Sequence, residues 1–119
     1  MQTQENRNDQ TNLFTVSDQN FEAQVLHSTL PVIVDFWAEW CPPCHSLAPM
    51  YERLSEEYIG KLRFAKMDID ESVSIPARLR VQAAPTLITF QNGKEIGRVV
   101  GPHPAHLKRA IDKMLAESR

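Results

Sequence analysis

The chain has 119 residues, of which 42% are hydrophobic and 24% charged, as is typical of a single globular domain with its own core. Its formal net charge of -2 offers no basic surface of the kind that binds nucleic acid or anionic lipid. No segment approaches the roughly 20 apolar residues of a membrane span, and the N-terminus lacks the apolar core of a signal peptide, so we expect a cytoplasmic protein not bound to a membrane.

The first residues are too polar to fold by themselves. Residues 1–12 contain a single apolar side chain and cannot bury enough surface to offset the entropy of ordering the segment. We therefore expect a disordered tail over residues 1–12 and one domain over residues 13–119.

The domain is expected to open with a β-strand and a helix. Residues 13–16 are a short strand candidate, after which Ser17 and Asp18 offer oxygens that can cap a helix. The apolar face of this helix would consist of Phe21, Val25 and Leu26.

The next segment predicts a buried central strand. Residues 32–38, VIVDFWA, are apolar on both sides of the pleat except at Asp35, which is typical of a strand covered on both faces in a sheet with parallel members. Asp35 then has two explanations. Either it lies near a strand end and bonds a backbone donor or water, or it is a buried carboxyl group with a raised pKa that exchanges protons with nearby thiols.

Cys41 and Cys44 are the only cysteines. A disulfide that closes so short a loop restricts the unfolded chain by only about 2 kcal/mol, so it is a poor structural staple. A metal site needs two more ligands, and the closely spaced pair His103 and His106 lies far outside zinc-finger spacing, so we expect no metal. The remaining interpretation is a reactive dithiol that opens and closes a small ring.

The cysteines lie where the buried strand passes into a helix. Because a residue before proline avoids the helical region, Pro43 is expected at the first helical position, with Cys41 just ahead of it. The partial positive charge at a helix N-terminus favours a thiolate there. We therefore expect Cys41 to be the exposed thiol and Cys44 to be shielded, with Pro49 kinking the helix. Its apolar positions are Leu47, Met50, Tyr51, Leu54 and Tyr58.

A third strand is predicted over residues 62–68, with Lys66 on the same face as Leu62 and Phe64. Lys66 is either a surface lysine whose stem covers apolar groups or a cation placed near Asp35 that influences its titration.

The rest of the chain predicts a short helix, a hairpin and a last helix. Ser72 can cap a helix through Leu79, and Asn92-Gly93 is a hairpin-turn signal between a fourth strand and a fifth over residues 95–100. Pro104 starts the last helix. Its predicted core positions are Leu107, Ile111 and Leu115.

The order β-α-β-α-β-α-β-β-α predicts an α/β fold with a central mixed five-stranded sheet and helices on both faces. Over residues 13–115, the chain now resembles the thioredoxin family, and the resemblance implies a thioredoxin-like fold. The resemblance is carried by residues 34–44, Pro49, residues 65–70, Ala84-Pro85-Thr86, Asn92-Gly93 and Val100-Gly101. A CxxC pair alone would be weak evidence, but all of these segments in this order along the chain are highly specific.

The resemblance implies a protein-disulfide reductase in which Cys41 attacks and Cys44 resolves, with Asp35 as the buried acid/base and Lys66 beside it. It also implies a cis peptide bond before Pro85, which would pack against the dithiol. The Ala84 backbone would then be free to pair with a substrate strand. The implied substrate-binding residues are Trp40, Pro42, Pro43, Ala84, Pro85 and Gly101.

The implied partners are disulfide-containing client proteins and an NADPH-dependent flavoprotein thioredoxin reductase, with no cofactor bound to the chain itself and no nucleic acid. Three departures from the family pattern leave substrate choice and redox poise open. Pro42 stands where the familiar motif has glycine, and His45 where it has lysine. Gln82-Ala83-Ala84 replaces a bulkier, glycine-containing approach to Pro85, which would make the wall of the substrate groove smaller. Rival interpretations are an oxidant or isomerase, and a non-catalytic binding module that uses the same groove.

Overall fold

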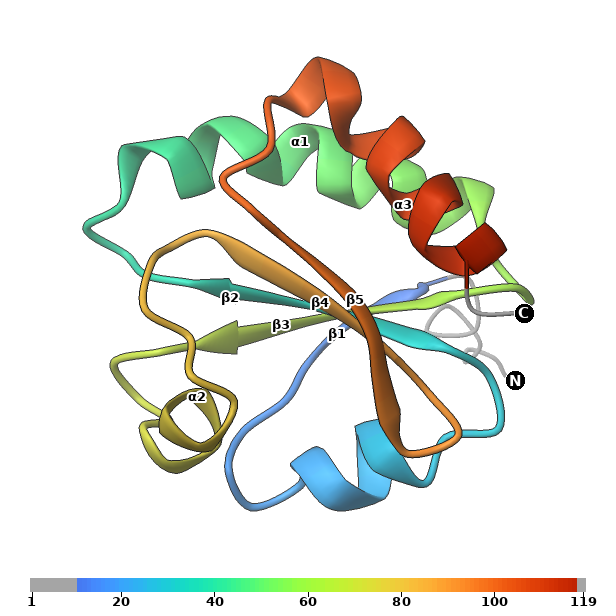
Figure 1. Cartoon of the computed structure of the whole chain (residues 1–119). Helices are drawn as coiled ribbons and strands as arrows, with labels where there is room; N and C mark the ends of the chain where they lie inside the picture. The colour runs from blue at the N-terminus through green and yellow to red at the C-terminus, as the bar shows by residue number, and fades with distance from the viewer. Residues whose placement is uncertain (1–10, 118–119) are drawn as a thin grey trace, which may run out of the picture.

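Five strands form one sheet in the order β1-β3-β2-β4-β5 in the computed structural model, which describes residues 11–117 (Figure 1). β2 is the central strand. It pairs in parallel with β3 and antiparallel with β4, so the predicted mixed sheet is confirmed. The strands are β1 (Leu13–Thr15), β2 (Val32–Trp37), β3 (Arg63–Asp68), β4 (Thr86–Gln91) and β5 (Lys94–Val100).

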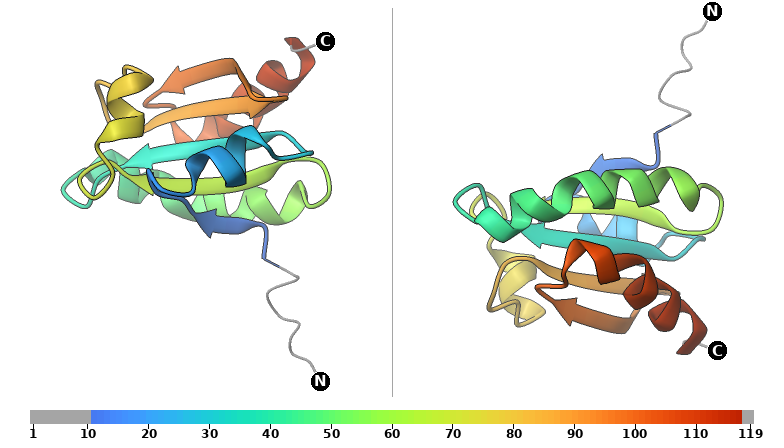
Figure 2. Two further views of the ribbon diagram at one scale, coloured as in Figure 1. Left: turned by 90° about the horizontal axis from the view of Figure 1, so that it is seen from below. Right: turned by 90° about the horizontal axis from the view of Figure 1, so that it is seen from above.

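Helices cover both faces of the sheet, as predicted. α1 and α3 lie on one face, and the π-helical turn η2 and the short α2 lie on the other (Figures 1 and 2). The helical elements are η2 (Glu22–Leu26), α1 (Pro42–Glu57), α2 (Ser74–Arg78), the 3-10 turn η3 (Pro104–His106) and α3 (Leu107–Glu117). None of them is long and apolar enough to cross a membrane.

The central strand separates two apolar cores. Val34 and Phe36 pack with Phe21 and Phe90 on the face of η2 and α2. Ile33 belongs to the other core, together with residues of α1 and α3. Side chains alternate across a pleated strand, and this accounts for the unbroken apolar run around Asp35: both faces of β2 are covered. Asp35 follows Ile33 by two residues, so its side chain points to the same face of the sheet, the one covered by α1 and α3.

Both predictions of side-chain capping around η2 and α2 were wrong. The Asp18 carboxylate accepts the backbone N–H groups of Ser74 (3.0 Å) and Ile75 (2.8 Å) at the start of α2 rather than those of η2. The Ser72 hydroxyl accepts the Asp18 N–H at 3.1 Å. Val73, the residue before α2, is in the helical region, whereas a side chain that caps its own helix needs an extended residue there. The loop after β1 therefore caps α2 from across the fold.

The β4–β5 hairpin turns at Asn92 and Gly93, whose φ angles of 55° and 78° are both positive, as the sequence signal predicted. Further along, Thr89 pairs with Gly97 and Phe90 with Glu95, so one extra residue of β5 forms a bulge.

The helix α3 packs closely on β5. A Cβ atom added at Gly97 would lie 2.7 Å from the Met114 side chain, so glycine allows the close approach. Leu107 and Ile111 are fully buried, as predicted. The third buried position is Met114, while Leu115 is half-buried, because the helix turns this residue toward the edge of its core face.

Most of the predicted tail, residues 1–10, lies outside the described residues. Asn12, which we placed in the tail, is bonded to the folded part: its side-chain amide donates to the backbone carbonyls of Ser55 (2.8 Å) and Leu62 (2.7 Å). One bond to α1 and one to the residue just before β3 hold this polar side chain, and hydropathy alone cannot reveal them.

Candidate active site

Cys41 occupies the N-cap of α1, with φ -105° and ψ 101°, and Pro42 is the first helical residue. The prediction that the helix starts at Pro43 was wrong by one residue. Cys41 obeys the preference for an extended conformation before proline, whereas Pro42 enters the helix, where its fixed φ suits the first turn. Pro49 lies inside α1, which continues through it to Glu57.

Cys41 and Cys44 are joined by a disulfide bond, one helical turn apart. The Cys41 Sγ accepts the backbone N–H of Cys44 at 3.2 Å and lies 3.4 Å from the Ala84 carbonyl oxygen. Both residues are almost fully buried, 2% and 3% exposed. The expected difference in exposure is therefore absent in this oxidised state, because the disulfide and the Ala84 backbone cover Cys41.

The Ala84–Pro85 peptide bond is cis, as the resemblance implied. Ala84 packs against the small cluster that contains the two cysteines and Ala38. The Pro85 carbonyl accepts the backbone N–H of Gly101 at 2.8 Å, so the chain beside the disulfide is tied to the end of β5. Gly101 has a φ of 60°, a left-handed conformation that favours glycine.

The surface next to the disulfide is largely apolar. Trp40, which directly precedes Cys41, is 65% exposed, and its indole N–H donates to the Asp70 carboxylate at 2.8 Å. Pro42, Pro43 and Gly101 line one shallow groove of about 540 Å³ with the segment after β5. An exposed apolar surface beside a reactive pair is able to receive another polypeptide.

Asp35 is buried, at 1% exposure, and neither carboxylate oxygen has a hydrogen-bond partner among residues 11–117. No described backbone donor bonds it. Burial raises the pKa of Asp35 from 3.8 to about 7, and the Lys66 charge partly offsets the rise. The group therefore changes protonation state near neutral pH, which suits a proton donor or acceptor.

Lys66 is the cross-strand neighbour of Asp35. Its ammonium nitrogen lies 4.8 Å from the centre of the Trp37 ring, a distance at which a cation is attracted to an aromatic face. This position fits the second explanation of Lys66, because its charge lowers the pKa of the Asp35 carboxyl.

Sequence reasoning missed three contacts around this site. Asp70 fixes the Trp40 indole, and its only signal was its place in the segment 65–70. The Tyr51 hydroxyl lies within hydrogen-bond distance of the Ile33 (3.1 Å) and Ala65 (2.8 Å) carbonyl oxygens under the sheet. Burial, and then the Asp35 charge, raise the pKa of Tyr51 well above its usual range.

The third missed contact belongs to His45, which is exposed in the first part of α1. Its Nε2 lies 2.7 Å from the Glu39 carbonyl oxygen, so the ring links the helix to the loop that carries Trp40. No group of three or more histidine, cysteine, aspartate or glutamate residues within residues 11–117 is arranged to hold a metal ion. The His103 ring instead accepts the Ala105 N–H at 3.0 Å and caps η3.

Comparison with known proteins agrees with this geometry. A family model described as thioredoxin matches residues 12–113. A thioredoxin of Rickettsia bellii is 46% identical over 88 residues, covering 74% of this chain and 84% of that protein. A thioredoxin of Acidithiobacillus ferridurans is 45% identical over 101 residues, covering 84% and 94%. The crystal structure of Malassezia sympodialis thioredoxin superimposes with a TM-score of 0.78 at 32% identity, covering 92% of this chain and 93% of that one.

The fold and its paired cysteines define a thiol-disulfide oxidoreductase, and the chain belongs to the thioredoxin family. Its substrates are disulfides, which it reduces through the Cys41–Cys44 pair.

Proposed function

We propose that Cys41 is the attacking thiolate of this reductase, Cys44 the resolving thiol and Asp35 the group that takes the Cys44 proton. The observation that carries the assignment is the position of the Cys41 sulfur at the N-cap of α1, where it accepts the Cys44 N–H. The same N–H, with the partial positive charge of a 16-residue helix, stabilises a thiolate at Cys41.

The reaction then balances in two exchange steps. The Cys41 thiolate attacks one sulfur of a client disulfide, which forms a mixed disulfide and releases the other client sulfur as a thiolate. Cys44 loses its proton toward Asp35 and attacks the Cys41 sulfur, which releases the second client thiolate and leaves the Cys41–Cys44 disulfide. Two electrons pass to the client, and the oxidised product is the state that the structure contains.

The client is proposed to lie on Trp40, Pro42, Pro43 and Gly101 and to pair with the backbone of Ala84, beside Pro85. The exposure of Trp40 and the groove formed by the prolines and Gly101 support this surface. An NADPH-dependent flavoprotein thioredoxin reductase is the proposed donor that restores the dithiol, and the cytoplasm the proposed location. A compartment that keeps thiols reduced suits a protein that must return to the dithiol form.

Trapping of the mixed disulfide tests the two cysteine roles. Cys44→Ser should attack clients and remain joined to them, whereas Cys41→Ser should not attack. Each variant is mixed with cell extract, free thiols are blocked, and a non-reducing gel is run, with the double Cys41→Ser/Cys44→Ser variant as the control. Equal adducts from the two single variants would overturn the roles, and none from either would favour the binding module.

The redox potential of the pair tests the direction of electron flow. A reductase should equilibrate near about -270 mV against glutathione, while a value of about -120 to -180 mV would mean an oxidant or isomerase.

A further inference from the structure

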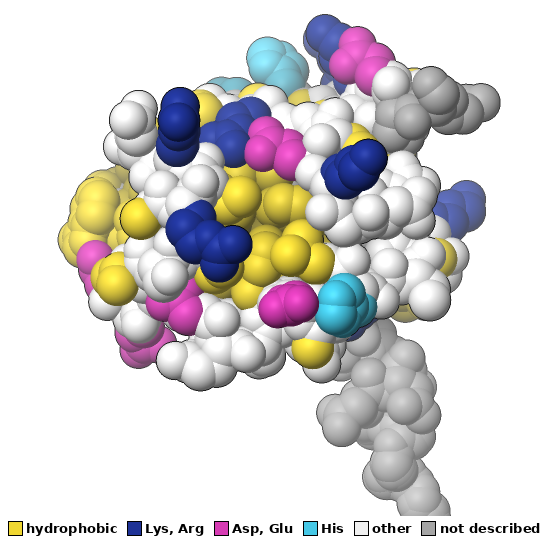
Figure 3. Space-filling model, turned by 60° about the horizontal axis from the view of Figure 1, so that its bottom comes forward, with side chains coloured by type: hydrophobic (Ala, Val, Ile, Leu, Met, Phe, Trp, Pro, Cys, Tyr) yellow, Lys and Arg dark blue, Asp and Glu magenta, His cyan; other side chains and the backbone are white. Residues whose placement is uncertain are grey.

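A hollow of about 450 Å³ lies between η2, α2 and the β4–β5 turn, on the face of the sheet opposite α1 and α3. Figure 3 shows it as an apolar depression with charged side chains around it. Its floor is formed by the buried side chains of Phe21, Ile75 and Phe90, and the half-buried Leu26 and Leu79 complete its apolar lining. None of these residues belongs to the proposed reductase site.

The shape and chemistry of the hollow suit a small ligand. Its volume falls within the roughly 300–1,000 Å³ of small-molecule pockets, which combine an apolar lining with a few polar groups. Phe21 and Phe90 meet edge to face beneath the hollow, with ring centres 5.4 Å apart, and both are almost fully buried. The half-buried Leu26 and Leu79 therefore offer most of the apolar surface that a ligand can reach.

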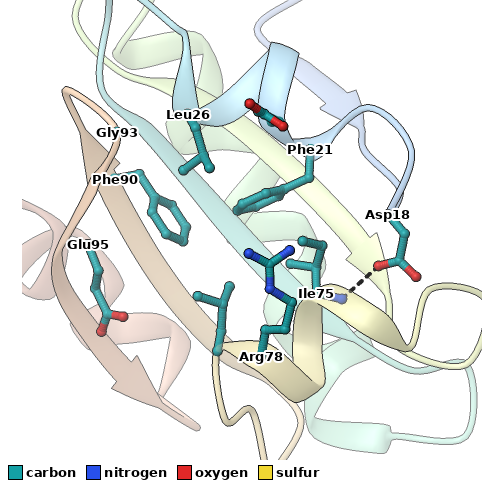
Figure 4. A pocket seen from close by; sticks show the side chains of 10 residues that line it. Asp18, Phe21, Leu26, Ile75, Arg78, Phe90, Gly93 and Glu95 are labelled. Carbon is teal, nitrogen blue, oxygen red and sulfur yellow. Dashed lines mark hydrogen bonds between the residues drawn. The ribbon is translucent and has the colours of Figure 1, made fainter.

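The charges at the rim differ in how far they are already engaged. Asp18 accepts the backbone N–H groups of α2, and both Glu95 oxygens accept from Arg98 at 2.7 and 2.8 Å. Glu22 lies 3.6 Å from His27, and both side chains of this pair are largely exposed. Arg78 lines the hollow from α2, and its side chain makes no hydrogen bond or ion pair with any residue in the described part of the chain. Figure 4 shows its side chain reaching from α2 toward Phe21.

We propose that this hollow binds a small apolar carboxylate, with its alkyl or aryl body on Leu26, Ile75 and Leu79 and its carboxylate on Arg78. A guanidinium group pairs with a carboxylate through two parallel hydrogen bonds, so the free Arg78 supplies the complementary charge. The nearby acidic side chains favour a ligand of low negative charge, because Glu22 and Glu95 repel a doubly charged phosphate more strongly than a singly charged carboxylate. A cationic ligand would have to compete with Arg98 for Glu95.

Titration with octanoate, below its micelle concentration and followed by amide NMR shifts of the full chain, tests the proposal. Shifts should be confined to η2, α2 and the β4–β5 turn. Arg78→Gln should weaken binding about tenfold, since loss of a charge-assisted pair is worth about 1.4 kcal/mol or more. Arg78→Lys should retain part of the affinity. Arg53→Gln, an exposed arginine on α1 across the sheet, is the matched control and should bind as the unchanged protein does.

Octylamine provides the comparison of ligand charge and should bind at least about tenfold more weakly than octanoate. Unchanged octanoate affinity in Arg78→Gln would overturn the proposal, as would octylamine binding that equals or exceeds octanoate binding. Shifts centred on Trp40 and Pro85, or no saturable shift at all, would also overturn it. Disulfide reduction by Arg78→Gln should match that of the unchanged protein, and this confirms that the variant is folded.

Discussion

Asp35 and Lys66 are direct neighbours on the parallel strands β2 and β3, yet no ion pair joins their charged ends. The lysine nitrogen lies over the Trp37 ring, and the Asp35 carboxylate has no hydrogen-bond partner among the described residues. Lys66 therefore acts on Asp35 through its charge at a distance, too weakly to offset burial, and the pKa of Asp35 stays near 7.

Asp35→Asn should slow disulfide reduction and stabilise the oxidised protein at neutral pH. Positioned acid/base groups contribute about 100-fold or more, and we expect a loss of roughly tenfold to 100-fold because water replaces part of the function. The folded pKa is raised from 3.8 to about 7, so the stability contribution of protonated Asp35 is present below about pH 4 and is lost as pH rises through 7. Asparagine stays neutral and avoids this loss.

The gain from Asp35→Asn should grow with pH and level off above about 7. Its upper limit is about 4 kcal/mol, at about 1.36 kcal/mol per pKa unit. Urea unfolding of both oxidised proteins across this pH range measures it, and the difference between the two removes the effect of the other carboxyl groups. A lower midpoint for the variant at pH 7 would mean that Asp35 is a stabilising anion.

Lys66→Gln should raise the pKa of Asp35 further, because it removes the positive charge that now opposes the effect of burial. A smaller fraction of Asp35 would be ionised at neutral pH. The pH at which the resolving step becomes faster should therefore be higher than in the unchanged protein. NMR titration of the Asp35 carboxyl carbon measures the shift. Lys61→Gln, an exposed lysine just before β3, is the control and should leave the titration unchanged.

Pro42→Gly should make the Cys41–Cys44 pair more oxidising. Proline at the first position of α1 restricts the dithiol form, and glycine increases the chain entropy that ring closure must remove. A shift of about 30 mV corresponds to about 1.4 kcal/mol. Equilibration with glutathione measures it, with Pro104→Gly, at the first position of η3, as the control. A more reducing Pro42→Gly would show that relief of ring strain outweighs entropy.

Asp18→Ala should destabilise the protein by about 1 kcal/mol, the usual cost of a lost helix cap. Burial alone raises the pKa of Asp18, but the N–H groups of Ile75, Ser74 and Val73 outweigh it and lower the pKa overall. The contribution of the ionised cap is therefore present above about pH 4 and is lost as pH falls through the lowered pKa. Urea unfolding at neutral and acidic pH measures it. A difference between variant and unchanged protein that persists in acid would contradict an ionic cap.

Local pattern was enough to predict the sheet, its helices and the dithiol. The apolar run around Asp35 identified the central strand, because only a strand covered on both faces tolerates such a run. Asn92-Gly93 identified the hairpin, because both residues accept positive φ. The position of Cys41 ahead of α1 followed from the prolines alone. Each of these signals depends on residues that are close together in the chain, so it can be read from a single sequence.

The contacts that sequence reasoning missed join residues far apart in the chain. Asp18 caps a helix more than 50 residues away, and Asp70 holds the indole of Trp40 across 30 residues. The choice of partner there depends on how loops meet after the sheet has formed. The burial of Cys41 has a similar origin, since the Ala84 carbonyl that covers it comes from the chain before β4.

The bulge in β5 has a consequence for solubility. β5 is one outer strand of the sheet, and besides the bulge it carries Lys94, Glu95 and Arg98; the other outer strand, β1, is only three residues long. Short, charged or bulged edges are poor templates for a strand from another molecule. These features disfavour edge-to-edge pairing between molecules, although each outer strand has one edge without a neighbouring strand.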